Sequence, residues 1–309
     1  MGKIAFIFPG QGAQAIGMGK DVYDQVPEAR EIFDVANRVL DYSLTDIIFN
    51  GPEDQLKQTA NTQPALLTTS YALYKAFEKK GIKPDFVAGH SLGEYSALVV
   101  AGVMTFAEAV AIVRKRGQFM EQAVPNGEGG MAAVLGASRE ALGALCDDIT
   151  AVTASVEMAN VNCPGQIVVS GAAAGIQAVV ERGKEAGAKR VLPLEVSGPF
   201  HSSLMKPAAV RLDAALSEVH WQDAFIPVVS NVSAHAEQNA DRIRTLLVEQ
   251  VFSPVLWEDS VRYMIEQGTD TFIEIGSGNV LSGLIKKIDR SVQIVTLNSL
   301  EAIQAYTAQ

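Results

Sequence analysis

The chain has 309 residues, of which 48% are apolar and 19% are charged, a balance typical of a globular protein with room for a main lobe and a smaller second one. Its net charge of −10 argues against nucleic acid or an anionic membrane as a partner, because phosphate groups attract basic surfaces. No apolar run approaches the roughly 20 residues that cross a bilayer, and the first run, Ile4–Phe8, is too short for a signal peptide. Cys146 and Cys163 show no metal-site spacing, so we expect a cytoplasmic protein without a metal.

The first part of the chain alternates between expected strands and helices. The expected strands are Ile4–Phe8 and Asp85–Gly89, and the expected helices after the second strand are Glu94–Ala101 and Thr105–Met120. A glycine-rich loop, Pro9–Gly19, follows the first strand. Glu108 lies three residues after Thr105, which predicts a capping box at that helix start. The alternation predicts an α/β, hydrolase-like lobe with a mainly parallel sheet.

The order of elements changes at Asn126–Gly130. From there we expect strand Met131–Leu135, helix Ser138–Asp148, strands Val156–Val161 and Gln166–Ser170, helix Ala172–Ala186 and strand Arg190–Val196. That is the β-α-β-β-α-β order of a ferredoxin-like unit. The chain then returns through helix Ser202–Val219 and strands Val228–Ser230, Thr271–Ile275 and Gln293–Thr296. We therefore expect a large catalytic lobe, residues 1–127 and 197–309, with a small ferredoxin-like lobe, residues 128–196, inserted in it.

Gly89-His90-Ser91-Leu92-Gly93 matches the G-x-S-x-G pattern of a nucleophile elbow. An expected strand precedes it and an expected helix follows it, which is the context that this motif requires. The turn is so tight that the neighbours of the nucleophile must be small, which explains Gly89 and Gly93. The alternative is an ordinary serine in a glycine-flanked turn. The setting favours Ser91 as a nucleophile, with backbone N–H groups at the helix start, including that of Leu92, pointing at the reacting oxygen.

A serine nucleophile needs a general base, which is usually histidine. The chain has His90, His201, His220 and His235. His90 is adjacent to Ser91 and its side chain should diverge, while His220 and His235 lie in polar stretches that are typical of solvated positions. His201 stands at a loop-to-helix junction after the small lobe, where sites are often built. We predict His201 as the base, and no carboxylate stands in a convincing turn before it, so a backbone carbonyl is an alternative partner for its imidazole.

Arg116 falls in the middle of the apolar stripe of the helix Thr105–Met120, which also contains Ala109, Ile112, Val113 and Met120. A cation on an apolar face is costly unless an anion meets it. One interpretation is a structural ion pair with a buried carboxylate. The other is a substrate carboxylate held by the guanidinium, in which case the acyl group is a dicarboxylic half-thioester.

The loop after the first strand contains Gly10-Gln11-Gly12 and allows two interpretations. Gly10-x-Gly12-x-x-Ala15 loosely resembles a dinucleotide fingerprint, although Pro9 interrupts the turn. Alternatively, the glycines let the backbone at Gln11 approach the site and add an oxyanion N–H, as a loop after an early strand does in hydrolase-like enzymes.

With these residues together, the sequence resembles the malonyl-CoA:acyl carrier protein transacylases of bacterial fatty acid synthesis, and also the acyltransferase domains of polyketide synthases. The resemblance covers nearly the whole chain. It is carried by Phe8-Pro-Gly-Gln-Gly12, Gln63-Pro64-Ala65, Gly89-His-Ser-Leu-Gly-Glu94, Arg116, Asn160-x-Asn162-x-Pro-Gly-Gln166, Gly198-Pro-Phe-His201, Gln250 and Glu274-x-Gly276-x-Gly278. One departure is Ser277, where the family pattern leads us to expect proline.

The resemblance implies a role for each matched residue. Ser91 corresponds to the nucleophile, His201 to the base and Arg116 to the arginine that binds the malonyl carboxylate. Gln11 and Leu92 correspond to the oxyanion donors, Gln250 to the residue whose main-chain carbonyl orients the histidine, and Phe200 to the malonyl-selective version of the family. Asn160 and Asn162 match the small-lobe turn, where we expect turn residues bonded to the backbone.

The implied activity is ping-pong transfer of malonyl from malonyl-CoA to the phosphopantetheine thiol of an acyl carrier protein, through a malonyl-serine and without a cofactor. Carrier proteins are typically acidic, so docking needs a basic patch, for which we nominate Lys189, Arg190, Lys286, Lys287 and Arg290; scattered solubilising charge is the alternative. Three other functions stay open at this point: a serine hydrolase such as a thioesterase, a nicotinamide-dependent oxidoreductase using the Gly10 loop, and a non-catalytic protein that binds acyl carriers.

Overall fold

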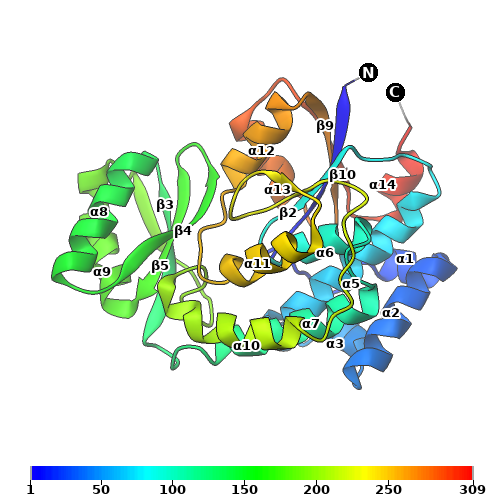
Figure 1. Cartoon of the computed structure of the whole chain (residues 1–309), viewed down its shortest axis with the longest axis horizontal. Coiled ribbons are helices and arrows are strands. Elements are labelled where there is room, and N and C mark those ends of the chain that lie inside the picture. The colour runs from blue at the N-terminus through cyan, green and yellow to red at the C-terminus, as the bar shows by residue number, and fades with distance from the viewer. Residues whose placement is uncertain (1, 308–309) are drawn as a thin grey trace.

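The computed structural model describes residues 2–307 and consists of two lobes of different construction (Figure 1). The large lobe contains a six-stranded sheet in the order β10-β9-β1-β2-β7-β8. Its strands are β1 (Lys3–Phe8), β2 (Phe86–Gly89), β7 (Val228–Val229), β8 (Ala236–Glu237), β9 (Thr269–Ile275) and β10 (Gln293–Leu297). Every neighbouring pair is parallel except β7 and β8. The predicted α/β lobe with a mainly parallel sheet is confirmed.

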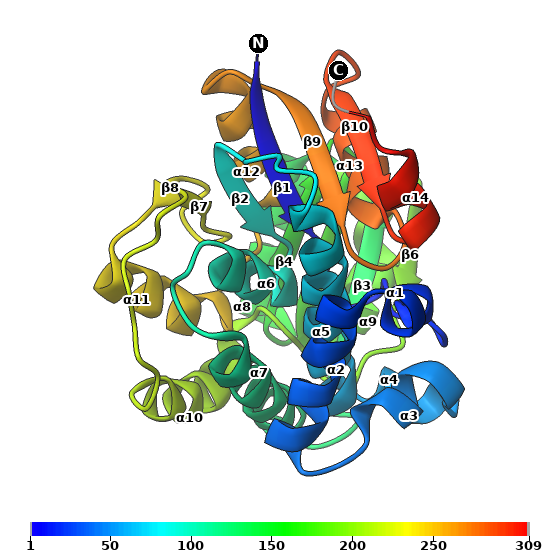
Figure 2. The ribbon, with the colours of Figure 1, turned by 90° about the vertical axis from the view of Figure 1, so that its right-hand side faces the viewer.

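Helices cover both faces of this sheet (Figure 2). They are α1 (Lys20–Gln25), α2 (Pro27–Leu40), α3 (Leu44–Asn50), α4 (Glu53–Lys57), α5 (Thr59–Glu78), α6 (Leu92–Val100), α7 (Phe106–Glu121), α10 (Lys206–Leu216), α11 (Ala240–Gln250), α12 (Trp257–Glu266), α13 (Val280–Ile288) and α14 (Leu300–Ala305). Successive residues of a strand point to opposite faces. Phe6 and Phe8 of β1 therefore pack into the core shared with α2, α5, α6 and α7, whereas Ala5 and Ile7 pack against α12 and α13.

The small lobe is a four-stranded antiparallel sheet in the order β4-β5-β3-β6. Its strands are β3 (Gly129–Leu135), β4 (Val156–Cys163), β5 (Gln166–Ala172) and β6 (Arg190–Pro193), and its helices are α8 (Arg139–Val152) and α9 (Ala173–Arg182), with a 3₁₀ turn at Gly183–Ala186. The sequence order β-α-β-β-α-β with this pairing is ferredoxin-like, as predicted. The helices pack on one face, where Leu142, Ile149 and Val179 join Val134 and Val169 in a separate core.

The other face of the small sheet is turned toward the large lobe. Met131 and Val168 from this face belong to the core of the large lobe. Two backbone hydrogen bonds join β4 to the loop before α12: Val161 N donates to Val255 O (2.9 Å), and Val255 N donates to Ala159 O (2.8 Å). The two lobes are therefore tied together next to the cavity that lies between them. The division into residues 1–127 with 197–309 and residues 128–196 stays a proposal.

Some element bounds differ from the sequence prediction, and proline explains one of them. β6 stops at Pro193 rather than Val196, and one further backbone bond to β3 follows it, from Leu194 N to Met131 O (2.9 Å). Within the expected helix Ser202–Val219, α10 begins only at Lys206, next to Pro207, since proline is accommodated in the first turn of a helix. The sequence did not predict α11 to α14 or β8. Between residues 2 and 307 there is no helix long and apolar enough to span a membrane.

Candidate active site

The turn between β2 and α6 has the geometry of a nucleophile elbow. Ser91 adopts φ 50° and ψ −106°, a strained conformation for a residue with a side chain. A Cβ on Gly89 would lie 1.9 Å from the carbonyl carbon of Gly93, and one on Gly93 would lie 2.1 Å from Phe8 O. Only glycine fits at both positions, because the new helix passes directly against β1 and β2. The local structure predicted around Ser91 is thus present.

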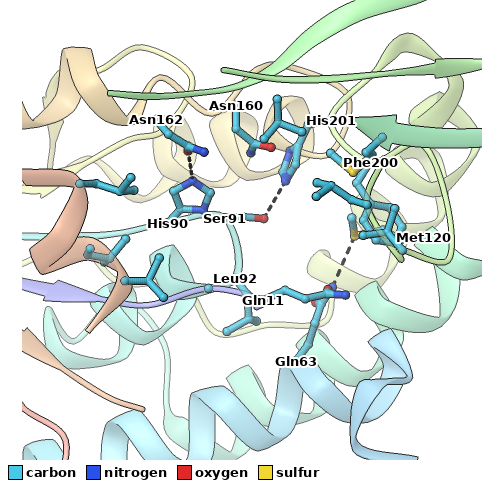
Figure 3. Close-up of a pocket in the computed structure, with 18 of the residues that line it drawn as sticks. Gln11, Gln63, His90, Ser91, Leu92, Met120, Asn160, Asn162, Phe200 and His201 are labelled. Carbon is cyan, nitrogen blue, oxygen red and sulfur yellow. Dashed lines mark hydrogen bonds between the residues drawn. The ribbon is translucent and has the colours of Figure 1, made fainter. Parts of the chain in front are cut away.

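Ser91 and His201 are in direct contact, although they are 110 residues apart. Ser91 Oγ lies 2.7 Å from His201 Nε2 (Figure 3). On the other side of the ring, His201 Nδ1 lies 2.8 Å from the backbone oxygen of Gln250. A carbonyl oxygen only accepts, so Nδ1 carries the proton and Nε2 is free to accept one from the Ser91 hydroxyl. Gln250 is the last residue of α11, where backbone carbonyls lack partners within the helix.

The imidazole of His201 is held in its neutral form. Burial, together with the positive charge of Arg116, lowers the pKa of His201 to about 3. A neutral imidazole with a free Nε2 is the form that accepts a proton. The other two distant histidines have no such setting: His220 is exposed and bonds to Glu108, and His235 is exposed and bonds to Ser233 O.

Arg116 reaches the same oxygen from α7. It is 1% exposed, and its Nη2 donates to Ser91 Oγ (3.1 Å) and to Gln250 Oε1 (2.9 Å). Its guanidinium carbon lies 5.5 Å from the centre of the Tyr95 ring. No carboxylate of residues 2–307 forms an ion pair with Arg116, and within the same residues its Nε has no hydrogen-bond partner. A buried cation without an ion-pair partner can bind an anionic group of a ligand.

A cavity of about 200 Å³ opens over these three side chains, between the two lobes. Its lining includes Gln11 and Leu92 from the carboxyl ends of β1 and β2 and Met131, Asn160, Asn162 and Val168 from the small sheet. This place, beyond the carboxyl ends of parallel strands, is where α/β proteins bind ligands. The backbone N–H groups of Gln11 and Leu92 have no hydrogen-bond partner among the described residues, so they are available to a ligand oxygen.

The dinucleotide interpretation of the Gly10 loop is wrong. That fingerprint requires the loop to open a helix, whose N-terminus binds the pyrophosphate, but the first helix after β1 starts only at Lys20. Gly10 instead allows a close approach to the elbow: a Cβ there would lie 2.2 Å from His90 O. The loop therefore packs on the nucleophile turn and brings Gln11 to the cavity.

The comparison with known families decides the classification. The acyl transferase domain matches residues 5–299. This chain belongs to that family. A malonyl CoA-acyl carrier protein transacylase of Bacillus subtilis (strain 168) is 54% identical over 304 residues, which cover 98% of this chain and 96% of the relative.

Solved structures of related enzymes match the fold of this chain over nearly its whole length. An acyl carrier protein S-malonyltransferase from Vibrio cholerae has a TM-score of 0.95 and 43% identity, covering 98% of this chain and 99% of that one. A malonyl-transacylase in complex with a type II polyketide synthase acyl-carrier protein also has a TM-score of 0.95, at 40% identity and 98% coverage of both chains. The acyl transferase fold thus extends over both lobes.

Two asparagines of this acyl transferase are not the turn residues that we expected. Asn160 and Asn162 lie on β4, and Asn162 Oδ1 is 2.8 Å from His90 Nε2 (Figure 3). The pairing of β4 with β5 shifts register twice in this segment, and such bulges re-aim side chains next to active sites. The prediction was wrong because the apparent turn signal, Pro164-Gly165, lies just beyond the strand. His90 is thereby turned away from Ser91, and burial lowers its pKa.

Asn231 is a site residue that sequence reasoning missed. Its Oδ1 accepts from Ser91 N (2.7 Å), and its Nδ2 donates to Gly89 O (2.7 Å), so one side chain bridges both ends of the elbow. The one sequence signal for it was its position directly after an expected strand, Val228–Ser230. Asn231 follows the parallel strand β7, which neighbours β2, and the carboxyl ends of neighbouring parallel strands meet at one edge of the sheet.

Proposed function

We propose that this chain transfers a malonyl group from malonyl-CoA to the phosphopantetheine thiol of an acyl carrier protein through a malonyl ester of Ser91. One observation carries the proposal: Ser91 Oγ contacts both His201 Nε2 and Arg116 Nη2 inside the cavity. A base and a cation without an ion-pair partner meet at one hydroxyl. The base suits acyl transfer, and the cation suits an acyl group that ends in a carboxylate.

In the first half-reaction, the Ser91 hydroxyl gives its proton to His201 Nε2 while Oγ bonds to the thioester carbon. The oxyanion is held by the N–H groups of Gln11 and Leu92, each worth about 3 kcal/mol of the barrier. The carbon–sulfur bond then breaks, and the proton on His201 goes to the departing coenzyme A sulfur. The carbonyl of Gln250 keeps Nδ1 protonated throughout.

The second half-reaction reverses these steps. The carrier thiol gives its proton to His201, its sulfur bonds to the ester carbon, and Ser91 Oγ leaves and recovers the proton. Arg116 holds the malonyl carboxylate in both halves, so an acyl group without a carboxylate leaves the guanidinium unpaired. Both half-reactions use side chains and backbone groups of the protein.

Five exposed basic residues support a docking surface for an acidic carrier protein. Lys189 and Arg190 begin the segment that reaches Leu194. Lys286 and Lys287 lie in the last turn of α13, which begins at Val280, and Arg290 follows shortly after the helix ends at Ile288. Leu194 and Val280 line the cavity, so both basic groups stand on segments that border it. None of the five forms an ion pair within residues 2–307.

We also propose a cytoplasmic location, because both cysteines are buried free thiols.

A transfer assay with malonyl-CoA and a holo acyl carrier protein tests this function. We expect malonyl-carrier to accumulate with the wild type and not with Ser91→Ala. Rapid release of coenzyme A and free malonate without the carrier would instead identify a thioesterase. No release of coenzyme A under either condition would favour a protein that only binds acyl carriers.

A further inference from the structure

A buried carboxyl group lies behind the site and has no part in the proposed steps. Glu94, in the first turn of α6, is 2% exposed. No Lys, Arg or His of the described chain lies within ion-pair distance of it. Its Oε2 accepts two hydrogen bonds, from Gln250 Nε2 (2.8 Å) and from Asn231 N (3.1 Å). Burial of a carboxyl group without a cationic partner costs free energy, which only its hydrogen bonds offset here. We therefore ask what these two hydrogen bonds do for the site.

The Gln250 side chain links this carboxyl group to Arg116. Its Nε2 donates to Glu94 Oε2, and at longer distances to Ser91 O (3.1 Å) and Asn231 Oδ1 (3.3 Å), while its Oε1 accepts from Arg116 Nη2. The acceptor at Glu94 requires the NH₂ end of the amide to face it. The oxygen end must then face the guanidinium. Glu94 makes the shortest of the three contacts of Nε2 and is its one carboxyl acceptor, so it contributes most to the orientation of the amide and thereby to the hydrogen bond with Arg116.

This arrangement does not depend on whether Glu94 is ionised. Burial raises the pKa of Glu94 to about 7, so the carboxyl group carries a proton part of the time near neutral pH. Both donors use Oε2, which places any proton on Oε1 and leaves Oε2 an acceptor in either form.

We propose that Glu94 is a positioning residue for Arg116, acting through the side-chain amide of Gln250, and that it thereby sets the preference for malonyl over acetyl groups. The inference rests on the proposed function. Apart from Ser91 Oγ itself, Gln250 Oε1 is the one hydrogen-bond acceptor of the Arg116 guanidinium in the part of the chain that the structure describes. Without that acceptor, the long arginine side chain regains rotamer freedom and presents its donors less often to an acyl carboxylate.

Two substitutions of Glu94 distinguish the effect of its hydrogen-bond acceptor from the effect of its side-chain volume. Glu94→Gln keeps an oxygen for both donors, whereas Glu94→Met fills a similar volume with a weak acceptor. The measurement is kcat and KM for transfer of malonyl and of acetyl groups to a carrier protein. We expect Glu94→Met to lower the malonyl-to-acetyl ratio of kcat/KM about tenfold, and Glu94→Gln to keep it within about threefold of the wild type. The malonyl-to-acetyl ratio is the readout because loss of the hydrogen bond to Asn231 N should slow transfer of both acyl groups to the same extent.

Three further variants make the test specific. In an Arg116→Ala background, Glu94→Met should leave the ratio unchanged, since the two residues act through one path. Gln250→Met removes the side-chain amide but keeps the backbone carbonyl for His201, so it should lower the malonyl-to-acetyl ratio as Glu94→Met does. If Glu94→Met does not fold, the ratio in Gln250→Met tests the proposal instead. Glu274→Met is the matched control, because Glu274 is also a buried carboxyl group but binds Leu281 N and Ser282 N of α13; it should lower stability without changing the ratio.

Any of three results would overturn the proposal. The first is an equal loss of malonyl and acetyl transfer in both Glu94→Met and Gln250→Met. The second is a malonyl-to-acetyl ratio that falls as far in Glu94→Gln as in Glu94→Met, and the third is a further fall of the ratio when Glu94→Met is added to Arg116→Ala. A wild type that transfers no malonyl at all would reject the proposed function itself. A wild type that prefers malonyl, together with variants that keep the preference, would reject only the role of Glu94.

Discussion

At the scale of single residues, one hydroxyl oxygen meets an acceptor and a donor at once. His201 Nε2 accepts a hydrogen bond from Ser91 Oγ, and Arg116 Nη2 donates one to the same Ser91 Oγ. Both partners are buried, so water competes little with either contact. The environment keeps the base neutral without a carboxylate beside it, since Gln250 supplies only a carbonyl oxygen. The imidazolium formed during the reaction is therefore stabilised less than one next to a buried carboxylate.

Replacement of Arg116 by alanine should separate malonyl from acetyl transfer. We expect malonyl kcat/KM to fall about a hundredfold or more, because the acyl carboxylate would be buried without its cation. Transfer of acetyl should fall much less. Steady-state kinetics with both coenzyme A esters checks this, and an equal loss for both would show that Arg116 does not select the acyl group.

The lowered pKa of His201 gives a prediction for stability against pH. In the folded protein this pKa is about 3, against the ordinary value of 6.5. Between these values the unfolded chain takes up a proton that the folded chain does not, so acid favours unfolding. Glutamine at position 201 cannot titrate. We therefore expect the thermal midpoint of His201→Gln to fall less than that of the wild type between about pH 7 and about pH 5. Parallel curves for the two proteins would contradict the assignment.

At the scale of elements, the elbow depends on close packing of α6 against β1. A methyl group at Gly93 would lie 2.1 Å from Phe8 O, a contact that backbone movement alone can relieve. We expect Gly93→Ala to lower the thermal midpoint and to slow acylation of Ser91, as measured by calorimetry and by release of coenzyme A. Gly283→Ala is the matched control, since it is also a helical glycine but has open space around its Cβ position. It should be neutral or slightly stabilising, because alanine has the higher helix propensity.

Local patterns predicted the elements around the elbow, but not the contacts that join distant segments. The capping box at Thr105 and Glu108 and the buried position of Arg116 follow from spacing within one helix, and both are present. Asn231 was missed because its role depends on β7 lying beside β2, which no local pattern encodes. Asn162 was misplaced in a turn because register shifts in β4 depend on the partner strand. Gln250 was named through family resemblance, since nothing in the sequence of α11 points to a carbonyl contact with His201.

At the scale of the whole molecule, the cavity exists only because the open face of the small sheet closes over the carboxyl ends of β1 and β2. Residues from both lobes line it. The backbone bonds between β4 and Val255, with the contact of Glu157 to Ser203 N (3.2 Å), fix this closure. Cavity shape therefore depends on the junction of the lobes as well as on the elbow.

The exposed basic residues on the two segments that reach the cavity lead to a prediction about the carrier protein. Reversing charge in the double variant Arg190→Glu with Lys287→Glu should raise KM for the acidic carrier several-fold, while KM for malonyl-CoA changes little. Added salt should weaken carrier recognition by the wild type and reduce the difference from the variant. Kinetics with each substrate varied in turn checks both statements, and an unchanged carrier KM would reject this docking surface.

In the proposed mechanism Ser91 carries the malonyl group between the two substrates. Intact-mass measurement after brief mixing with malonyl-CoA alone, followed by sequencing of the labelled peptide, tests it most directly. We expect one malonyl group per chain, attached at Ser91, absent from Ser91→Ala and removed by a holo carrier protein. An unlabelled wild type, or a label at any other residue, would contradict it.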